Sequence, residues 1–210
     1  MSYITKHPVV ILITGFSLSG RKTFSELLKK SIPKGGYVIM KVNDIVSEET
    51  AREFSLPVKY FTEKKFCDNI LQPYDTFCGR SAKDLSCGWE KVMRKENKYH
   101  WAEQLFKKMD VIFRNGVQFI CVNDWKKIKD MKYLEEKIGE KYVIKVRITR
   151  DSAPSTEEDD NIDFDLIDEE SQNIIMDYVV RNDKSVNDMY KDFIMPIAEQ
   201  IQKDFVPQDE

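Results

Sequence analysis

Chemically versatile side chains are scarce in this chain of 210 residues. The histidines and cysteines are His7, His100, Cys67, Cys78, Cys87 and Cys121. Because zinc sites need three or four such ligands, usually at short spacings, and no C-x-x-C pair is present, we do not expect zinc. We expect the cysteines to be free thiols.

Long apolar runs are also missing. No stretch approaches the roughly 18 apolar residues of a membrane-spanning helix. Residues 1–8 show neither the basic start nor the small-residue cleavage site of a secretory signal. We therefore expect a cytoplasmic protein without a membrane partner. The length suits a single domain over residues 1–210 that buries roughly 70% of its unfolded surface.

Charge is distributed unevenly along the chain. Residues 151–170 contain ten acidic side chains and no Lys or Arg, so with a net charge of −3 the remainder carries +7. A basic body suits phosphate-bearing small ligands. Nucleic acid is the weaker alternative, because nucleic-acid binders usually have denser Lys/Arg clusters interleaved with aromatics. The acidic stretch, about 150–173, is expected to be a solvated loop or a lid-like segment that competes with phosphate.

Strand and helix patterns alternate along the chain. The first strand, residues 8–14, is continuously apolar, as is typical of a buried parallel strand. Further strands are predicted at 37–42, 117–123, 141–148 and 177–180, and helices at 23–30, 130–138 and 185–203. Residues 47–115 carry helical periodicity and are predicted to form a helical insertion. The order predicts an α/β fold, a doubly wound parallel sheet of about five strands.

A phosphate-binding loop is the most specific motif. Gly15 and Gly20 lie between the first strand and a helix, at the spacing of G-x-x-x-x-G-K-[ST]. Backbone N–H groups and the positive end of the helix bind phosphate in such loops. The predicted cofactor-binding residues are Gly15, Ser19, Gly20, Arg21, Lys22 and Thr23. A tight turn without a ligand is the alternative.

Two positions of this motif depart from the pattern. Arg21 stands where lysine is usual, and Lys22 stands where a hydroxyl is usual. The planar guanidinium of arginine does not reproduce the compact charge of an ammonium, so phosphate binding could persist while the geometry of transfer suffers. Lys22 cannot bind Mg²⁺, so Thr23 or Ser19 would have to replace the hydroxyl, or water would hold the metal.

Charged side chains follow two other predicted strands. Asp124 comes after the third strand and is predicted to hold Mg²⁺ or its water shell, with capping of the next helix as the alternative. Arg147 and Arg150 are placed after the fourth strand and, with Arg21, are predicted to neutralise charge on a transferred phosphoryl group. A solvated arginine pair is the alternative. Carboxyl ends of parallel strands share one edge of the sheet, so these groups should meet there.

Together these segments resemble the P-loop kinase family that contains viral deoxynucleoside monophosphate kinases and animal-type phosphomevalonate kinases. Residues 15–22 follow the family's G-x-x-x-S-G-K-D, with Arg21 and Lys22 at the last two positions. Residues 88–94, followed by Trp101, are similar to its acceptor-facing helix pair. Residues 124–130 are similar to its D-x-R-R-x-x-[DE], and residues 177–185 to the stretch near the adenine, with Lys184 in place of glycine.

The resemblance implies a nucleoside monophosphate kinase type of fold, with ATP and Mg²⁺ as cofactors. It places Arg94 and Lys126 on the acceptor phosphate and Asn182 near the nucleotide. Ser47 stands where the family has a lysine. The implied activity is ATP-dependent phosphoryl transfer to a phosphorylated small molecule, a (deoxy)nucleoside monophosphate first and phosphomevalonate second. By analogy a homodimer is expected. The alternative from another class is a catalytically inactive kinase-fold protein that acts as a binding or scaffold protein.

Overall fold

The structure is a computed structural model that describes residues 8–16, 18–32, 36–125, 127–151 and 176–206. The chain divides into two compact units. We call Met1–Lys41 with Phe106–Glu210 the sheet unit, and Val42–Leu105 the helical unit. The helical unit therefore begins earlier and also ends earlier than the insertion predicted at 47–115.

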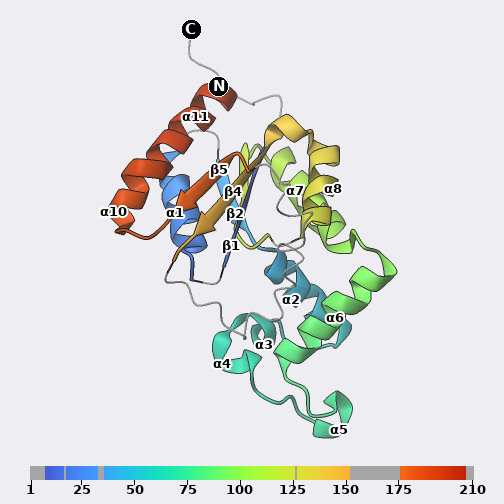
Figure 1. Ribbon diagram of the computed structural model, residues 1–210. Helices are drawn as coiled ribbons and strands as arrows, with labels where there is room; N and C mark the ends of the chain where they lie inside the picture. The colour runs from blue at the N-terminus through green and yellow to red at the C-terminus, as the bar shows by residue number, and fades with distance from the viewer. Residues whose placement is uncertain (1–7, 17, 33–35, 126, 152–175, 207–210) are drawn as a thin grey trace. The chain divides into compact units, whose positions relative to one another are not determined.

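Five parallel strands form the sheet (Figure 1). Their order across the sheet is β2-β3-β1-β4-β5. The strands are β1 (Val9–Gly15), β2 (Tyr37–Met40), β3 (Phe119–Val122), β4 (Val143–Thr149) and β5 (Tyr178–Arg181). This arrangement confirms the predicted α/β class and the doubly wound parallel sheet. The first strand is central and its residues 9–13 are completely buried, which explains its unbroken apolar sequence.

The strand register shows which strand ends lie together at one edge of the sheet. β1 pairs with β3 from Val9↔Phe119 onward and with β4 as far as Gly15↔Ile148. β5 pairs with β4 through Thr149↔Arg181. Because all five strands run in the same direction, the segments that follow β1, β4 and β5 begin at the same edge.

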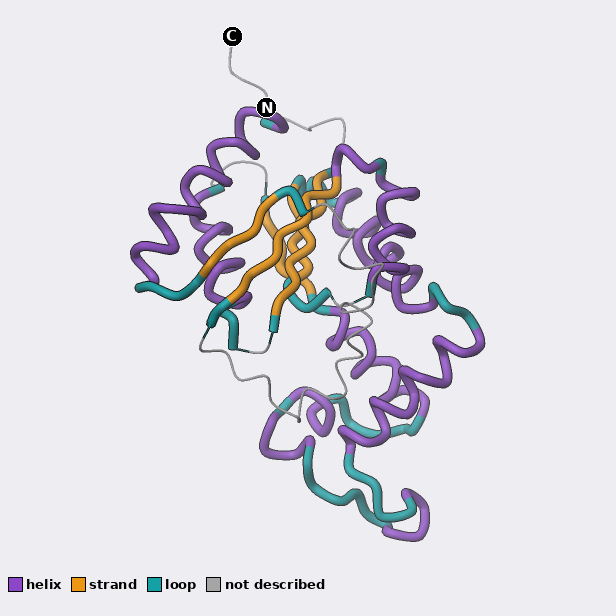
Figure 2. Tube along the Cα trace, in the orientation of Figure 1, coloured by secondary structure: helices purple, strands orange, loops and turns teal. Residues whose placement is uncertain are grey.

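Helices cover both faces of the sheet within the sheet unit (Figures 1 and 2). Helices α1 (Arg21–Ser31), α10 (Val186–Met189) and α11 (Met195–Phe205) share a core with one face, to which Ile11, Phe24 and Ile201 contribute. Helix α8 (Ile128–Ile138) faces the other side, where Glu135 Oε1 lies 2.9 Å from Lys145 Nζ of β4. A 3₁₀ turn, Glu140–Tyr142, precedes β4.

The C-terminal helix is not the single α-helix predicted at 185–203. A π-helical segment, Tyr190–Ile194, separates α10 from α11. The buried residues Met189 and Ile194 are five positions apart, whereas Ile194, Ile197 and Ile201 follow α-helical spacing. A π turn accommodates the five-residue step and keeps both groups on the core side.

The helical unit has its own core. Its elements are α2 (Val42–Glu53), α3 (Lys59–Thr62), α4 (Lys64–Cys67), α5 (Tyr74–Phe77), α6 (Ala82–Glu96) and the start of α7 (His100–Arg114). Phe61, Leu71 and Leu85 are among the residues buried together there. A capping box opens α6, in which Ser81 Oγ accepts from Asp84 N. Because α2 starts at Val42, the strand predicted at 37–42 ends at Met40.

Two expectations from composition can be compared with this structure. All four cysteines are free, and burial raises the pKa of Cys121 to about 12. Within the described ranges, no helix has the length and apolar character needed to cross a bilayer.

Candidate phosphate-binding site

The loop after β1 is shaped by two glycines. Gly15 has φ +149°, and a Cβ there would overlap the carbonyl oxygen of Ile148 in β4. Gly20 has φ +102°, and a Cβ there would overlap the side-chain amide of Asn182. Both positions therefore require glycine for steric reasons as well as conformational ones. The spacing of the two glycines in the motif therefore has a structural basis in these two close approaches.

Asn182 connects this loop to the end of β5. Its Nδ2 donates to the Ser19 carbonyl oxygen at 2.8 Å, and its own backbone N–H donates to Thr149 O at 2.8 Å. The side chain is buried, so the bond is shielded from water. The resemblance predicts that Asn182 binds nucleotide. The structure gives it a contact with the phosphate-binding loop, and its contact with a ligand stays a prediction.

The start of α1 suits an anion. Gly20 is the N-cap residue, and the structure records no side-chain cap and no acidic residue in the first turn among the residues it describes. By contrast, α6 and α10 both begin with complete capping boxes. The first N–H groups of a helix lack intrahelical acceptors and carry about half a positive charge. The N-terminus of α1 therefore retains donors for a ligand.

A cavity of about 390 Å³ lies at this helix end. Its described lining includes four cationic side chains and no carboxylate. Arg21 and Lys22 come from α1, Arg150 follows β4, and Lys184 follows β5. Leu18, Val186 and Met189 supply apolar surface to the same cavity. Separate segments of the chain thus bring positive charge and apolar contacts to one place, as a phosphorylated ligand with an apolar ring would require.

The two arginines predicted to act together lie in different places. Arg150 follows β4 directly and lines the cavity. Arg147 was predicted to follow the strand, but it lies within it, because β4 continues to Thr149. It pairs with Thr14 in the sheet register, is half-buried, and is not among the described residues that line the cavity.

The hydroxyl and ammonium groups of the loop take unequal positions. Thr23 lines the cavity. Lys22 also lines it, but its side chain is 80% exposed and its Nζ lies 4.0 Å from Glu26 Oε1. Ser19 is completely buried, and among the described residues its Oγ has no hydrogen-bond partner. A Cβ built on Gly15 would lie 2.9 Å from that Oγ, so the hydroxyl sits beneath the loop.

The end of β3 is tied to the first turn of α1. Asn123 Nδ2 donates to Ser25 Oγ at 3.3 Å, and Ser25 Oγ donates to Lys22 O at 2.9 Å. The neighbouring Asp124 is buried. Over the described part of the chain, no three His, Cys, Asp or Glu side chains form a metal-binding group. Asp124 is not among the described residues that line the cavity, whereas Thr23 is, so the binding of Mg²⁺ by Asp124 stays a prediction.

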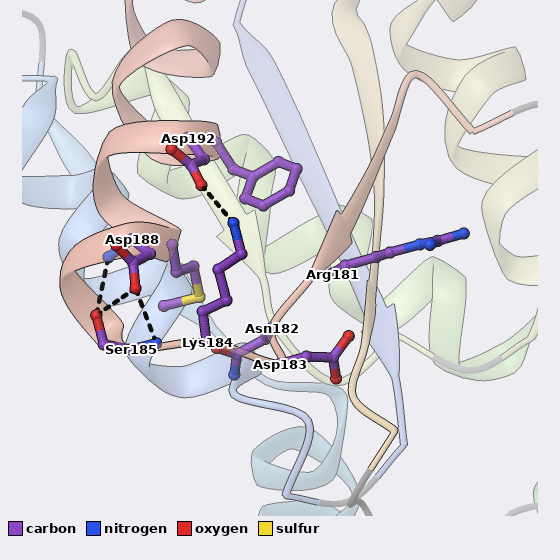
Figure 3. Close-up of a pocket in the computed structure, with 9 residues that line it drawn as sticks. Arg181, Asn182, Asp183, Lys184, Ser185, Asp188 and Asp192 are labelled. Carbon is purple, nitrogen blue, oxygen red and sulfur yellow. Dashed lines mark hydrogen bonds and ion pairs between the residues drawn. The ribbon is translucent and has the colours of Figure 1, made fainter.

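A second, smaller cavity of about 230 Å³ adjoins the loop after β5 (Figure 3). Lys184 extends toward the helix, and its Nζ lies 3.6 Å from Asp192 Oδ2. Ser185 and Asp188 form the capping box of α10, with Ser185 Oγ 2.7 Å from Asp188 Oδ2. These bonds from Ser185 lower the pKa of Asp188. Asn182, Lys184 and Met189 line both cavities.

The predicted acceptor residues of the helical unit are engaged in its own structure. Arg94 Nε lies 3.2 Å from Glu90 Oε1, and the Arg94 side chain is only 19% exposed. Ser47, at the family's lysine position, is buried and its Oγ donates to Phe61 O at 3.5 Å. The other predicted acceptor residue, Lys126, lies outside the described residues, as does nearly all of the acidic segment.

Sequence reasoning missed one close side-chain contact of the helical unit. His100 Nε2 lies 2.8 Å from Glu49 Oε2, and both side chains are mostly buried. The partners are 51 positions apart on different helices, so no local spacing signals the pair. The bridge from Asn182 to Ser19 was missed for the same reason.

Comparison with known proteins supports the fold more than the narrower family. No family model matches the sequence, and no curated protein matches it. Among solved structures, a dephospho-CoA kinase from Campylobacter jejuni has a TM-score of 0.51 at 14% identity, covering 93% of this chain and 98% of that one. The chain therefore has a P-loop kinase fold. At this identity the similarity shows the fold alone.

Proposed function

We propose that the sheet unit binds ATP with Mg²⁺ at the start of α1, and that the protein transfers the γ-phosphoryl group to a phosphorylated small molecule. The observation that carries this proposal is the meeting of an uncapped helix N-terminus with cationic side chains from three parts of the chain. Helix N–H groups and cations together are the usual protein ligands of polyphosphate. The P-loop kinase fold of the chain agrees with it.

The chain's residues fit the cofactors as follows. Backbone N–H groups at Gly20 to Thr23 would bind phosphate oxygens, and Arg21 and Arg150 would offset their charge. Thr23 and Asp124 are the candidate protein ligands of Mg²⁺. When bound, the metal neutralises charge on the phosphates. Arg147 is half-buried within β4, and the role predicted for it stays a prediction.

A (deoxy)nucleoside monophosphate is the proposed acceptor. Arg94 is its proposed phosphate ligand, with Lys126 as a second by resemblance. An acceptor phosphate would have to compete with Glu90 for Arg94, which favours a doubly charged group over a single carboxylate. Phosphomevalonate remains the second candidate acceptor. The homodimer and the cytoplasmic location stay expectations of the sequence.

A catalytically inactive binding protein is the second candidate function. It is favoured by the ammonium of Lys22, which lies beside Glu26 and is largely exposed, and by the buried Ser47 at the family's lysine position. In this case the cavity would bind nucleotide without transfer, because in-line transfer depends on the position of each charge.

Calorimetric titration and thermal unfolding with ATP and Mg²⁺ test the binding step. We expect saturable binding, and at a ligand concentration of 100 Kd a stabilisation of about 2.7 kcal/mol. The control is Lys203→Ala, which removes an exposed cation from α11. An unchanged unfolding midpoint with ATP, ADP and deoxynucleoside monophosphates would contradict the proposal.

Turnover separates the two candidate functions. A coupled assay of ADP release is run with nucleoside monophosphates, deoxynucleoside monophosphates and phosphomevalonate as acceptors. For the enzyme we expect acceptor-dependent ADP release, and for Arg21→Lys an increase in kcat of about tenfold or more, because the ammonium is restored. Binding of ATP without ADP release, in both the wild type and Arg21→Lys, would instead support the inactive protein.

A further inference from the structure

Among the described residues, Lys184 is the one cation that lines both cavities beside the loop after β5. The resemblance places glycine at this position, so its side chain is a feature of this chain. Lys184 approaches the start of α1 from the segment after β5, whereas Arg21 is the first residue of α1 itself.

The backbone around Lys184 is held at both ends. On one side, Asn182 Nδ2 donates to Ser19 O at 2.8 Å and connects the segment to the phosphate-binding loop. On the other side, Asp188 N donates to Ser185 Oγ at 3.2 Å, and Ser185 N donates to Asp188 Oδ2 at 3.2 Å. The base of the Lys184 side chain therefore has a fixed position relative to Gly20.

The head of the side chain is held only weakly. Its Nζ lies 3.6 Å from Asp192 Oδ2, and the side chains are 73% and 50% exposed (Figure 3). Exposed ion pairs of this kind contribute little to stability because water and salt screen them. A polyphosphate, with several charges, can displace a single exposed carboxylate from a lysine.

We propose that Lys184 is a phosphate-binding residue, which supplies from the loop after β5 the ammonium that the phosphate-binding loop lacks at position 21. Asp192 is its partner when no phosphate is bound. The inference rests on the proposed binding of a nucleoside triphosphate and adds a residue to that site. Lys22 lines the same cavity from α1, with Glu26 beside it, so Lys184 adds an ammonium from a second segment of the chain.

The test compares two probes, ATP with Mg²⁺ and inorganic tripolyphosphate, by calorimetric titration. Lys184→Ala should weaken both by about tenfold, the usual cost of losing one charge-assisted bond. Lys184→Arg should keep the affinity within about threefold. Lys203→Ala, with the same change of charge on α11, should leave both affinities unchanged.

The partner residue gives an independent arm. Asp192→Asn should strengthen both probes about twofold to fivefold, because the lysine no longer has a competing carboxylate. In the double variant with Lys184→Ala this gain should vanish, since the two residues act through one contact. Circular dichroism of each variant confirms that it is folded.

Each other outcome overturns a stated part. Unchanged affinities in Lys184→Ala, or a gain from Asp192→Asn that persists without Lys184, overturn the inference. Weakening of ATP alone assigns Lys184 to the base and also overturns it. If the wild type binds tripolyphosphate in a Lys184-dependent way but does not bind ATP, the inference stands and the proposed function falls. If neither probe binds, both fall.

Discussion

At the scale of single residues, Asn182 determines the shape of the phosphate-binding loop more directly than any cation does. Its amide holds the Ser19 carbonyl, and it occupies the space that a side chain at position 20 would need. Asn182 directly follows β5 and is 163 positions away from Ser19 in the sequence. The geometry of the loop is thus set partly from β5.

Asn182→Ala tests this role. We expect a loss of about 1–3 kcal/mol in the free energy of unfolding, because the buried Ser19 carbonyl loses its donor. ATP affinity should fall as well, since the loop loses its support. Urea unfolding and calorimetric titration measure the two effects. Asn187→Ala, at an exposed position on α10, is the control and should change neither.

An Asn182→Ala variant that keeps full stability and ATP affinity would show that the loop is rigid without this bond.

The sequence could predict Gly15, Gly20 and the cavity position of Arg150, because these follow from local spacing and from strand ends. It could not predict the Asn182 bridge, which depends on the register of β5. The place of Arg147 was wrong because the strand predicted at 141–148 already includes this residue, and β4 continues beyond it to Thr149.

At the scale of elements, the starts of helices α1 and α10 differ in kind. The start of α1 has no side-chain cap in the described structure, whereas that of α10 has reciprocal bonds between Ser185 and Asp188. The capped helix end is satisfied within the chain, and the uncapped one retains donors. This difference supports the proposed ligand binding at the start of α1 and a supporting role for the start of α10.

Ser185→Ala removes the cap of α10. We expect a loss of about 1 kcal/mol in stability and a lower ATP affinity, because the adjacent Lys184 and Asn182 lose a fixed neighbour. Ser81→Ala removes the matching cap of α6 in the helical unit and is the control. It should cost similar stability and leave ATP affinity unchanged. Equal effects of both variants on ATP affinity would contradict a local role for Ser185.

The same cap predicts a pH dependence. Bonds from Ser185 lower the pKa of Asp188 from its ordinary value of 3.8. A lowered pKa in the folded state means that the cap stabilises fully above pH 3.8 and is lost as the pH falls through the folded value. Unfolding between pH 7 and pH 2.5 should show a larger loss in the wild type than in Ser185→Ala, which keeps only the bond from the backbone N–H of residue 185.

Elements were predictable where one physical signal dominated. The unbroken apolar run of β1 marks a strand buried on both faces, and the structure has it there. The C-terminal helix was predicted as continuous because apolar residues recur along it. The five-residue step from Met189 to Ile194 is a small departure from that pattern, and only packing against the sheet shows that both residues are buried.

At the scale of the whole molecule, each of the two units has its own core, and both cavities belong to one of them. Both cavities described above are lined by residues of the sheet unit alone. The helical unit has a separate core around Phe61, Leu71 and Leu85. Damage to that core should therefore lower stability without changing the phosphate-binding site.

Leu85→Ala and Leu28→Ala make this comparison with the same substitution. Both leucines are buried, the first in the helical unit and the second in α1. Each should cost about 2–5 kcal/mol. Leu28→Ala should also weaken ATP, whereas Leu85→Ala should leave the affinity of the folded protein within about twofold. Unfolding curves and titrations measure both, and equal weakening of ATP would contradict the division.

The π-helical segment, Tyr190–Ile194, accommodates one extra residue between two helices that both pack on the sheet. One extra residue in an α-helix turns everything beyond it by about 100°, and here the turn absorbs that rotation where it arises. Asp192 lies inside this segment, between the residues of α10 beside the cavity and those of α11 in the core. Insertions or deletions at this point can change the surroundings of the ligand while the packing against the sheet stays in phase.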